Sequence, residues 1–168
     1  MSAAGLPAVD TAAADLFWSE YAAARPEAVR LCSDYTVERF GDSAVLADGL
    51  LRAVTEGAKR ATSELADEFL AAGDSLPRIG SHWIACDGRG QPRLVMRSLE
   101  LRVGPVSSVD DAFAYDEGEG ERTREWWLDA HRGYWQRSCA RMGLDYDDSM
   151  EAVFERFAVV WPPELADE

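Results

Sequence analysis

Two runs of β-forming residues flank a short glycine-containing turn near the middle of the chain, and this hairpin pattern constrains the fold most. The runs cover residues 81–87 and 93–103, and the turn is Gly88-Arg89-Gly90. The early part of the second run is apolar on both faces, which is expected of a curled sheet rather than a flat one. Helical patterns lie on both sides of the hairpin, so the sequence predicts an α+β protein.

Helices are predicted before and after this hairpin from apolar spacing, capping residues and terminating glycines. The chain has no internal repeat, no coiled-coil heptad pattern and no linker long enough to separate two domains. We therefore expect a flexible tail over residues 1–11 and a single domain over residues 12–163. The predicted helices cover residues 12–24, 43–56, 64–72 and 124–142, with a helical turn over 110–115, and a last strand, in the same sheet as the hairpin, covers residues 150–161.

The chain is acidic: 31 Asp and Glu residues against 17 Lys and Arg residues give a formal net charge of −14. This charge disfavours non-specific binding to a nucleic-acid backbone, although it is compatible with one local basic cleft. No apolar run reaches the ~18–20 residues that a membrane span needs, and residues 1–15 lack the basic region of a signal peptide, so a cytoplasmic protein is expected. The three cysteines and two histidines lack zinc-site spacing, and no metal, cofactor or disulfide framework is expected.

One lysine stands among the 17 basic residues, and all the others are arginine. Lysine can lose its proton in a desolvated site and act as a base or nucleophile, whereas arginine stays charged. Lys59 precedes Thr62 by three residues, so a helical backbone would place both on one side. Two functions fit: a Thr–Lys pair of the kind that some hydrolases use, or, with Ser63 and nearby backbone N–H groups, a cradle for a phosphate or carboxylate. A surface lysine followed by a helix-capping threonine is the structural alternative.

An acidic, glycine-punctuated loop is predicted over residues 116–121. Glu117 and Glu119 alternate with Gly118 and Gly120, so the backbone there can approach a ligand closely. The two glutamates are candidates for general acid/base chemistry or for orienting a lysine ammonium. Alternatively, the loop is a solvated segment that precedes the next helix.

Aromatic residues are numerous and could stack on a nucleobase, although most of them are expected to form the core. The candidates for base contacts are Trp18, Trp83 and Tyr134. Arg97 interrupts the apolar face of the second predicted strand, and a charge in such a place needs a partner. We expect Arg97 to pair with a carboxylate of the acidic loop or to face a polar cavity.

Short motifs occur in a fixed order along residues 40–161. They are Phe40-Gly41-Asp42, Ala47-Asp48, Gly57-x-Lys59-x-x-Thr62, Pro77-x-x-Gly80, Met96-Arg97-Ser98-Leu99-Glu100, Glu117-Gly118-Glu119-Gly120 and His131-Arg132-x-Tyr134-Trp135. In their order and spacing, these motifs resemble the ASCH domain family of the PUA-like superfamily. The similarity is to a longer bacterial branch of that family, which has an additional N-terminal helix.

The resemblance implies a small β-barrel of about five to six strands surrounded by helices, with a cleft suited to RNA or to a nucleoside. In the acetylcytidine amidohydrolases of the short bacterial branch, a lysine, a threonine three residues later and a distant glutamate are the proposed catalytic groups. These groups map onto Lys59, Thr62 and Glu117, and Glu119 is close enough to compete for the last role. Some longer relatives resemble ribonucleases instead.

Three functions follow from these residues and from the resemblance. The first is a hydrolase that removes an acyl group from a modified nucleoside, in which Thr62 attacks after giving its proton to a neutral Lys59. The second is a ribonuclease acting on single-stranded RNA, and the third is a non-catalytic module that binds RNA or a nucleotide. In the ribonuclease, Lys59 and Arg97 would hold the phosphate and Glu117 would act as base. The residues expected to contact the ligand besides Lys59, Thr62 and Glu117 are Ser63, Arg97, Glu119, Trp18, Trp83 and Tyr134.

Overall fold

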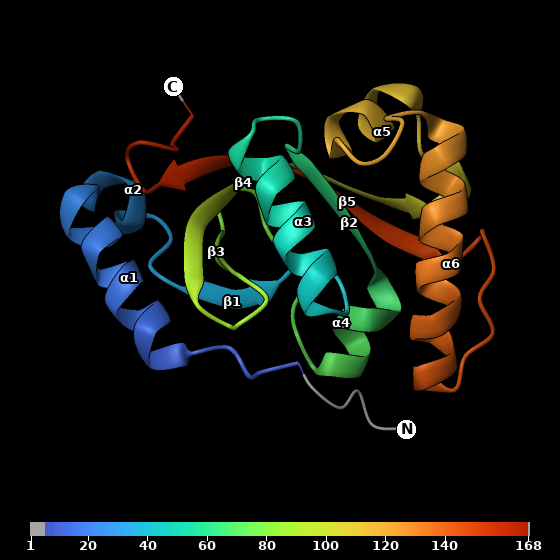
Figure 1. The fold of residues 1–168 in the computed structure, drawn as a ribbon, viewed down its shortest axis with the longest axis horizontal. Helices are drawn as coiled ribbons and strands as arrows, with labels where there is room; N and C mark the ends of the chain where they lie inside the picture. The colour runs from blue at the N-terminus through green and yellow to red at the C-terminus, as the bar shows by residue number, and fades with distance from the viewer. Residues whose placement is uncertain (1–5, 168) are drawn as a thin grey trace. The chain divides into compact units, whose positions relative to one another are not determined.

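The computed structural model describes residues 6–167, which divide into two compact units. The first unit contains Ile79–Leu99 and the described parts of residues 1–56 and 157–168. The second unit contains Gly57–Arg78 and Glu100–Arg156. One five-stranded sheet has the strand order β1-β3-β4-β5-β2, and β4 and β5 each contribute residues to both units (Figure 1).

The first unit combines three helices with the parallel and antiparallel pairs β1–β3 and β3–β4. Asp10 and Ser43 begin two of its helices, because their side chains accept hydrogen bonds from the backbone N–H groups of Ala13 and Leu46. Its elements are α1 (Thr11–Ala24), α2 (Pro26–Arg30), β1 (Tyr35–Arg39), α3 (Ala44–Thr55) and β3 (His82–Cys86), with the first part of β4 (Pro92–Pro105) and the last part of β5 (Glu151–Trp161).

Side chains alternate across β3 and β4, so this strand pair has two apolar faces. One face packs against α1, and the cluster between them contains Ala14, Trp18 and Tyr21 of the helix with Ile84, Cys86 and Val95 of the strands. The other face packs against α3, and the cluster there contains Leu51 and Val54 of the helix, Trp83, Ala85, Leu94 and Met96 of the strand pair, and Phe157 of β5. Trp18 and Trp83 are therefore core residues of the first unit, one on each face.

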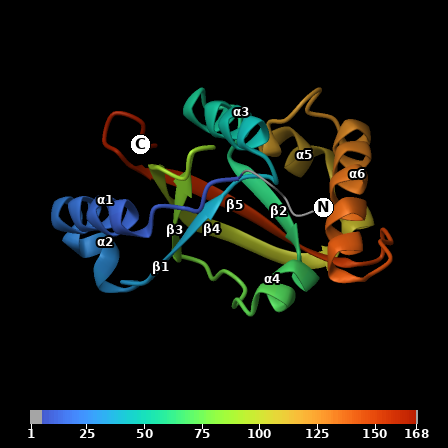
Figure 2. The same cartoon turned by 60° about the horizontal axis from the view of Figure 1, so that its bottom comes forward.

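The second unit pairs β2 with β5 and carries the longest helix. The β2–β5 pair is antiparallel, with a register from Ala61 opposite Arg156 to Leu65 opposite Ala152. In both views of the ribbon, α5 lies beside α6 (Figures 1 and 2). The elements are β2 (Ala61–Leu65), α4 (Ala66–Ala72), the 3₁₀ helix η1 (Val106–Ser108), α5 (Asp111–Glu117) and α6 (Arg124–Met142), with the remaining parts of β4 and β5.

The core of the second unit is built between the strands and helices α5 and α6. Phe113 of α5 and Trp127 of α6 both contact the ring of Phe154 on β5. Tyr134 is half-buried and packs against this core rather than lying free at the surface. The buried members are Ala61, Leu65, Val106, Val109, Phe113, Ala114, Trp127, Leu128, Trp135, Cys139, Ala152 and Phe154.

The predicted α+β class is confirmed, and the three predicted strands correspond to β3, β4 and β5 of one sheet. Strands β1 and β2 were not predicted. Because residues 61–65 form β2, the predicted helix over 64–72 begins at Ala66, and the helical spacing considered for Lys59 and Thr62 does not occur. Residues 1–5 of the predicted tail lie outside the described residues, and no helix within residues 6–167 is long and apolar enough to cross a membrane.

Candidate functional site

Lys59 lies buried between two carboxylates of the acidic loop, and all three residues belong to the second unit. Its Nζ is 2.6 Å from Glu119 Oε1 and 3.7 Å from Glu117 Oε1, and it also donates to the Glu117 backbone oxygen at 3.4 Å. The Lys59 side chain is only 1% exposed, so this is an ammonium group removed from water and held by carboxylate partners.

Glycine at position 118 allows the acidic loop to pack directly against the segment that carries Lys59. Gly118 ends α5 in a left-handed conformation with φ of 69°. A Cβ atom at this position would lie 2.2 Å from the Ala58 carbonyl oxygen and 2.7 Å from the Lys59 nitrogen, which no side chain can tolerate. The backbone N–H of Arg60 also donates to the Asp116 carbonyl at 2.8 Å. The glycines were predicted to let the backbone approach a ligand, and in the structure Gly118 instead approaches the chain's own lysine segment.

Glu117 is the last residue of α5, and its buried carboxylate is surrounded by hydrogen-bond donors. Oε1 lies 3.1 Å from His131 Nε2, and Oε2 accepts from the indole N–H of Trp127. The Ser63 hydroxyl donates to Oε2 at 3.1 Å. Three elements, β2, α5 and α6, thus converge on this one side chain.

His131 faces an acceptor at each of its ring nitrogens. Nε2 meets the Glu117 carboxylate, and Nδ1 lies 2.8 Å from the Trp127 carbonyl oxygen. Two acceptors are satisfied together only by the doubly protonated imidazolium. The Trp127 ring stacks on that of His131, with centroids 4.0 Å apart, because the two residues are four positions apart on α6.

The pKa values of Glu117 and His131 are shifted in opposite directions from their ordinary values. Burial by itself raises the pKa of Glu117, but the charges of His131 and Lys59 and the hydrogen bonds from His131 and Trp127 outweigh it, so the pKa lies well below its usual range. Burial lowers the pKa of His131, and the larger combined effect of the Glu117 charge and hydrogen bond raises it above 6.5. Both shifts favour the charged forms, as does the pair of acceptors around His131, so Glu117 and His131 are arranged as a buried ion pair.

Thr62 projects from the face of β2 opposite to the one that contacts Glu117. Successive side chains on a strand alternate in direction, and Ser63 is the residue whose hydroxyl reaches Glu117. Across β2, Thr62 is paired with Glu155 of β5. The structure therefore brings Lys59, Ser63, Glu117 and Glu119 together and places Thr62 on the other side of the strand.

Three further candidates, Trp18, Trp83 and Arg97, belong to the first unit. The two tryptophans are buried in its core, and Arg97 makes no ion pair with a carboxylate among the residues that the structure describes. Conversely, the hydrogen bonds of Trp127 and His131 to Glu117 were not predicted from the sequence. Their spacing of four residues on a predicted helix was the available signal, and it was assigned to the apolar stripe of that helix.

Lys59 and the carboxylates beside it are suited to proton transfer and to stabilising an oxyanion. Within residues 6–167, no group of three or more His, Cys, Asp and Glu side chains is arranged to hold a metal ion. The ammonium of Lys59 can stabilise negative charge on a carbonyl oxygen, and a carboxylate beside it can take or return a proton. Glu119 is the more accessible of the two carboxylates, with a side chain 16% exposed against 2% for Glu117.

Comparisons with known proteins agree with this architecture. The ASCH domain family model matches residues 36–161 of the chain. The chain is similar to the crystal structure of an ASCH domain from Lactobacillus crispatus JV V101, at 24% identity and a TM-score of 0.83 over 92% of this chain and 97% of that chain. It is also similar to protein EF3133 from Enterococcus faecalis V583, at 25% identity and a TM-score of 0.80 over 90% of each chain. A search of curated protein sequences found no match.

Proposed function

This chain belongs to the ASCH domain family, and we propose that its second unit hydrolyses the acyl amide of a modified nucleoside such as N-acylated cytidine. In this proposal, Lys59 and Glu119 are the reacting groups. One observation carries it: the 2.6 Å contact between Lys59 Nζ and Glu119 Oε1, in which a buried ammonium meets a partly exposed carboxylate. A substrate bound at Glu119 therefore lies close to the positive charge that this carboxylate contacts.

The reaction uses one water molecule and returns its protons to the products. Glu119 takes a proton from water as the water oxygen attacks the acyl carbon, and the Lys59 ammonium stabilises the negative charge that develops on the carbonyl oxygen. When the tetrahedral intermediate collapses, the carbon–nitrogen bond breaks and the proton on Glu119 passes to the leaving amine. The products are a carboxylic acid and the nucleoside with a free exocyclic amine.

Glu117 holds Lys59 in place and takes no proton in this mechanism. Its two carboxylate oxygens already accept from His131, Trp127 and Ser63. Its lowered pKa makes it a weak base, because a general base works best when its pKa is near the working pH. Between the two glutamates that the sequence left as alternatives, the contacts favour Glu119 for the chemistry.

Thr62 has no step in the proposed reaction. As a nucleophile, Thr62 would have to give its proton to a neutral amine at Lys59. Two observations speak against that arrangement: the ion pairs of Lys59 with Glu117 and Glu119, and the placement of Thr62 on the β2 face opposite Ser63. Water is therefore the nucleophile, and the role of Thr62 is structural, as part of strand β2.

A small neutral ligand suits the charge of this chain better than a long polyanion. With a net charge of −14, the protein repels a phosphate backbone except where cations are concentrated. A salt titration of binding separates the two ligand classes. A nucleoside should bind with almost no dependence on salt, whereas a steep negative slope with single-stranded RNA would favour the RNA-directed functions instead.

The proposal is tested by measuring the release of cytidine from N-acylated cytidine by chromatography. Glu119→Gln removes the base and should lower the rate by at least about 100-fold, the usual contribution of general base catalysis. Glu121→Gln is the matched control, because Glu121 is an exposed glutamate two residues further along the same loop and should leave the rate within about twofold. No cytidine from the wild-type protein, or equal rates in both variants, would overturn the proposal.

A further inference from the structure

Glu119 lies between two glycines, which give the backbone around it unusual freedom. Gly118 and Gly120 both have a positive φ, 69° and 52°, and glycine adopts such angles readily. The same freedom makes the segment costly to order, because glycine loses more conformational entropy than other residues do. The 2.6 Å contact between Glu119 and Lys59 therefore depends on whatever else fixes this backbone.

Arg122 closes the turn that carries Glu119, and it does so in a strained conformation. Its backbone N–H donates to the Glu119 carbonyl oxygen at 2.9 Å, which is the hydrogen bond that closes a β-turn. Its φ is 58°, and no other non-glycine residue within residues 6–167 has a positive φ. A residue with a Cβ atom adopts this conformation at a cost in free energy, so its other contacts must offset that cost.

The side chain of Arg122 supplies these contacts and connects two segments that meet at the candidate site. Its Nε donates to the carbonyl oxygen of Tyr115, in the last turn of α5, at 2.9 Å. Its Nη2 donates to the carbonyl oxygen of Ala58, the residue before Lys59, at 3.3 Å. The guanidinium also lies over the Tyr115 ring, 3.6 Å from the ring centre, which is a favourable cation–π distance. One side chain thus ties the acidic loop to α5 and to the lysine segment.

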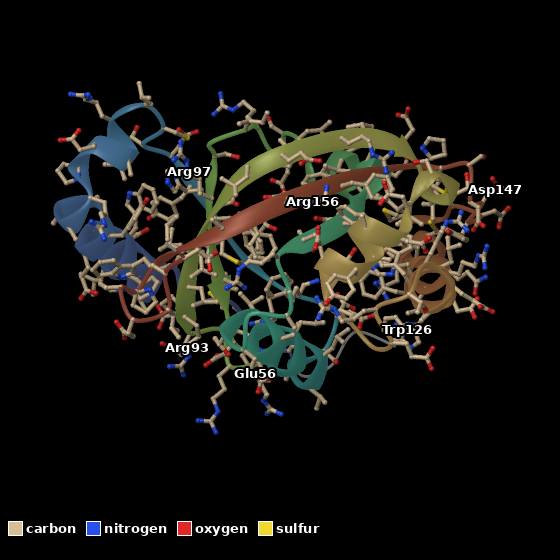
Figure 3. The ribbon with its side chains drawn as sticks, turned by 90° about the horizontal axis from the view of Figure 1, so that it is seen from above. Glu56, Arg93, Arg97, Trp126, Asp147 and Arg156 are labelled. Atoms are coloured by element: carbon tan, nitrogen blue, oxygen red, sulfur yellow. The ribbon has the colours of Figure 1, made fainter. Side chains whose placement is uncertain are left out.

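Trp126, in the first turn of α6, packs against the same loop (Figure 3). A Cβ atom at Gly120 would overlap the indole ring, so the ring lies directly against the backbone next to Glu119. An apolar contact of this kind has no preferred direction, whereas a hydrogen bond does. The hydrogen bonds of Arg122 are therefore the contacts that set where Glu119 lies.

We propose that Arg122 is a positioning residue, which holds Glu119 against Lys59. Its backbone N–H fixes the turn, and its guanidinium fixes the distance between that turn and the lysine segment. Arg122 itself neither binds the substrate nor transfers a proton. The effect on hydrolysis rests on the proposed function, whereas the effect on the contact between Lys59 and Glu119 does not.

The lone lysine of the chain allows this contact to be followed by NMR. In protein grown with nitrogen-labelled lysine, the single Nζ signal belongs to Lys59, and hydrogen exchange of its ammonium reports how often the loop opens. Arg122→Gln should raise this exchange rate at least about tenfold, because two hydrogen bonds and a cation–π contact are lost. Arg122→Gly should also raise it, although glycine adopts the positive φ without strain.

Arg124→Gln is the matched control for the loss of an arginine. Arg124 belongs to the same unit, and its guanidinium also donates to two backbone carbonyl oxygens, those of Val109 and Ser107, at 2.7 and 2.8 Å. These partners precede α5 and are not part of the lysine segment. The exchange rate at Lys59 should therefore stay within about twofold of the wild type. A wild-type exchange rate in Arg122→Gln or Arg122→Gly, or an equal rise in Arg124→Gln, would overturn the positioning role.

The kinetics of hydrolysis separate positioning from substrate binding. Arg122→Gln should lower kcat for N-acylated cytidine at least about tenfold, because a displaced base loses its alignment, and should leave KM within about twofold. A raised KM with an unchanged kcat would contradict the positioning role. If the wild-type protein released no cytidine while the exchange rates still differed, the proposed hydrolysis would fail and the hold of Arg122 on the contact between Lys59 and Glu119 would stand.

Discussion

Lys59 is the residue on which the candidate site depends, because its ammonium offsets the charge of two nearby carboxylates. An exposed ion pair contributes about 0–1 kcal/mol to stability, whereas removal of one partner from a buried pair leaves a charge without compensation. Lys59 and Glu117 are both buried, and removal of the lysine would leave His131 as the charged partner of Glu117 and would take from Glu119 the cation it contacts. The sequence pointed to Lys59 by its chemistry, as a lone lysine among arginines, but could not show which carboxylate it meets.

Replacement of Lys59 by methionine should lower the free energy of unfolding by about 1.5–3 kcal/mol, because Glu119 loses the cation it contacts while Glu117 keeps His131. Urea denaturation measures this change. Arg93→Met removes an exposed arginine whose partner, Asp87, keeps the hydrogen bonds from the backbone of Arg89 and Gln91, and it should cost at most about 1 kcal/mol. Similar losses in the two variants would show that Lys59 is not held as a buried ion-pair partner.

The Glu117–His131 pair should give the stability of the protein a maximum at mildly acidic pH. The raised pKa of His131 makes its contribution complete below pH 6.5, and this contribution is lost as the pH rises through the value in the folded protein. The lowered pKa of Glu117 makes its contribution complete above pH 4.5, and this contribution is lost as the pH falls through its folded value.

The Glu117–His131 pair is tested by measuring the free energy of unfolding as a function of pH, for the wild type and for His131→Gln. The difference between the two proteins should be largest between pH 4.5 and 6.5 and should shrink as the pH rises further. A difference that stays constant with pH would mean that His131 is not charged in the folded protein.

Strand β2 shows which elements the sequence could predict and which it could not. β5 is rich in valine and aromatic residues, β3 contains Trp83 and Ile84, and β4 carries a run of apolar residues, Leu94 to Met96, after the turn that separates it from β3, so their local pattern identifies them. β2 has only five residues, Ala-Thr-Ser-Glu-Leu, and becomes a strand by pairing with β5. The contacts of Ser63, Trp127 and His131 with Glu117 depend on that pairing and therefore could not be read from spacing.

The two hydroxyl residues of β2 should respond differently to truncation. Ser63→Ala removes a hydrogen bond to a buried carboxylate and should cost about 1.5–3 kcal/mol of unfolding free energy. Thr62→Ala, on the opposite face, should cost less than about 1 kcal/mol and should retain amide hydrolysis. Thermal denaturation and the cytidine assay measure both effects. Loss of hydrolysis in Thr62→Ala with an intact fold would restore Thr62 as the nucleophile.

The turn after α5 depends on glycine more strongly than the turn after α6 does. Gly118 and Gly143 have almost the same φ, 69° and 73°, but only Gly118 lies against backbone atoms. Gly143→Ala should therefore cost only the conformational penalty of about 1–2 kcal/mol. Gly118→Ala adds an overlap with Ala58 and Lys59 and should cost clearly more, as measured by urea denaturation. Equal costs would mean that the acidic loop does not pack against the lysine segment.

At the scale of the whole molecule, membership in the ASCH family establishes the fold, and the chemistry has to be argued from the site. The family model covers residues 36–161, close to the 40–161 over which the motifs were recognised. The net charge of −14 is a property of the full chain and favours a neutral substrate over a polyanion. What the sequence could not supply was the division of roles between Glu117 and Glu119, because it follows from burial in the folded protein.

The central claim is that Lys59 and Glu119 act together on one substrate, and a double-mutant cycle on kcat/KM for N-acylated cytidine tests it most directly. The single variants Lys59→Met, which removes the cation, and Glu119→Gln, which removes the base, should each lose activity, and both are compared with the variant that combines them. Groups that act as a unit are strongly non-additive, so the double variant should lose about as much activity as the more impaired single variant. Losses that multiply, or a Glu119→Gln variant as active as the wild type, would contradict the joint role of the two residues.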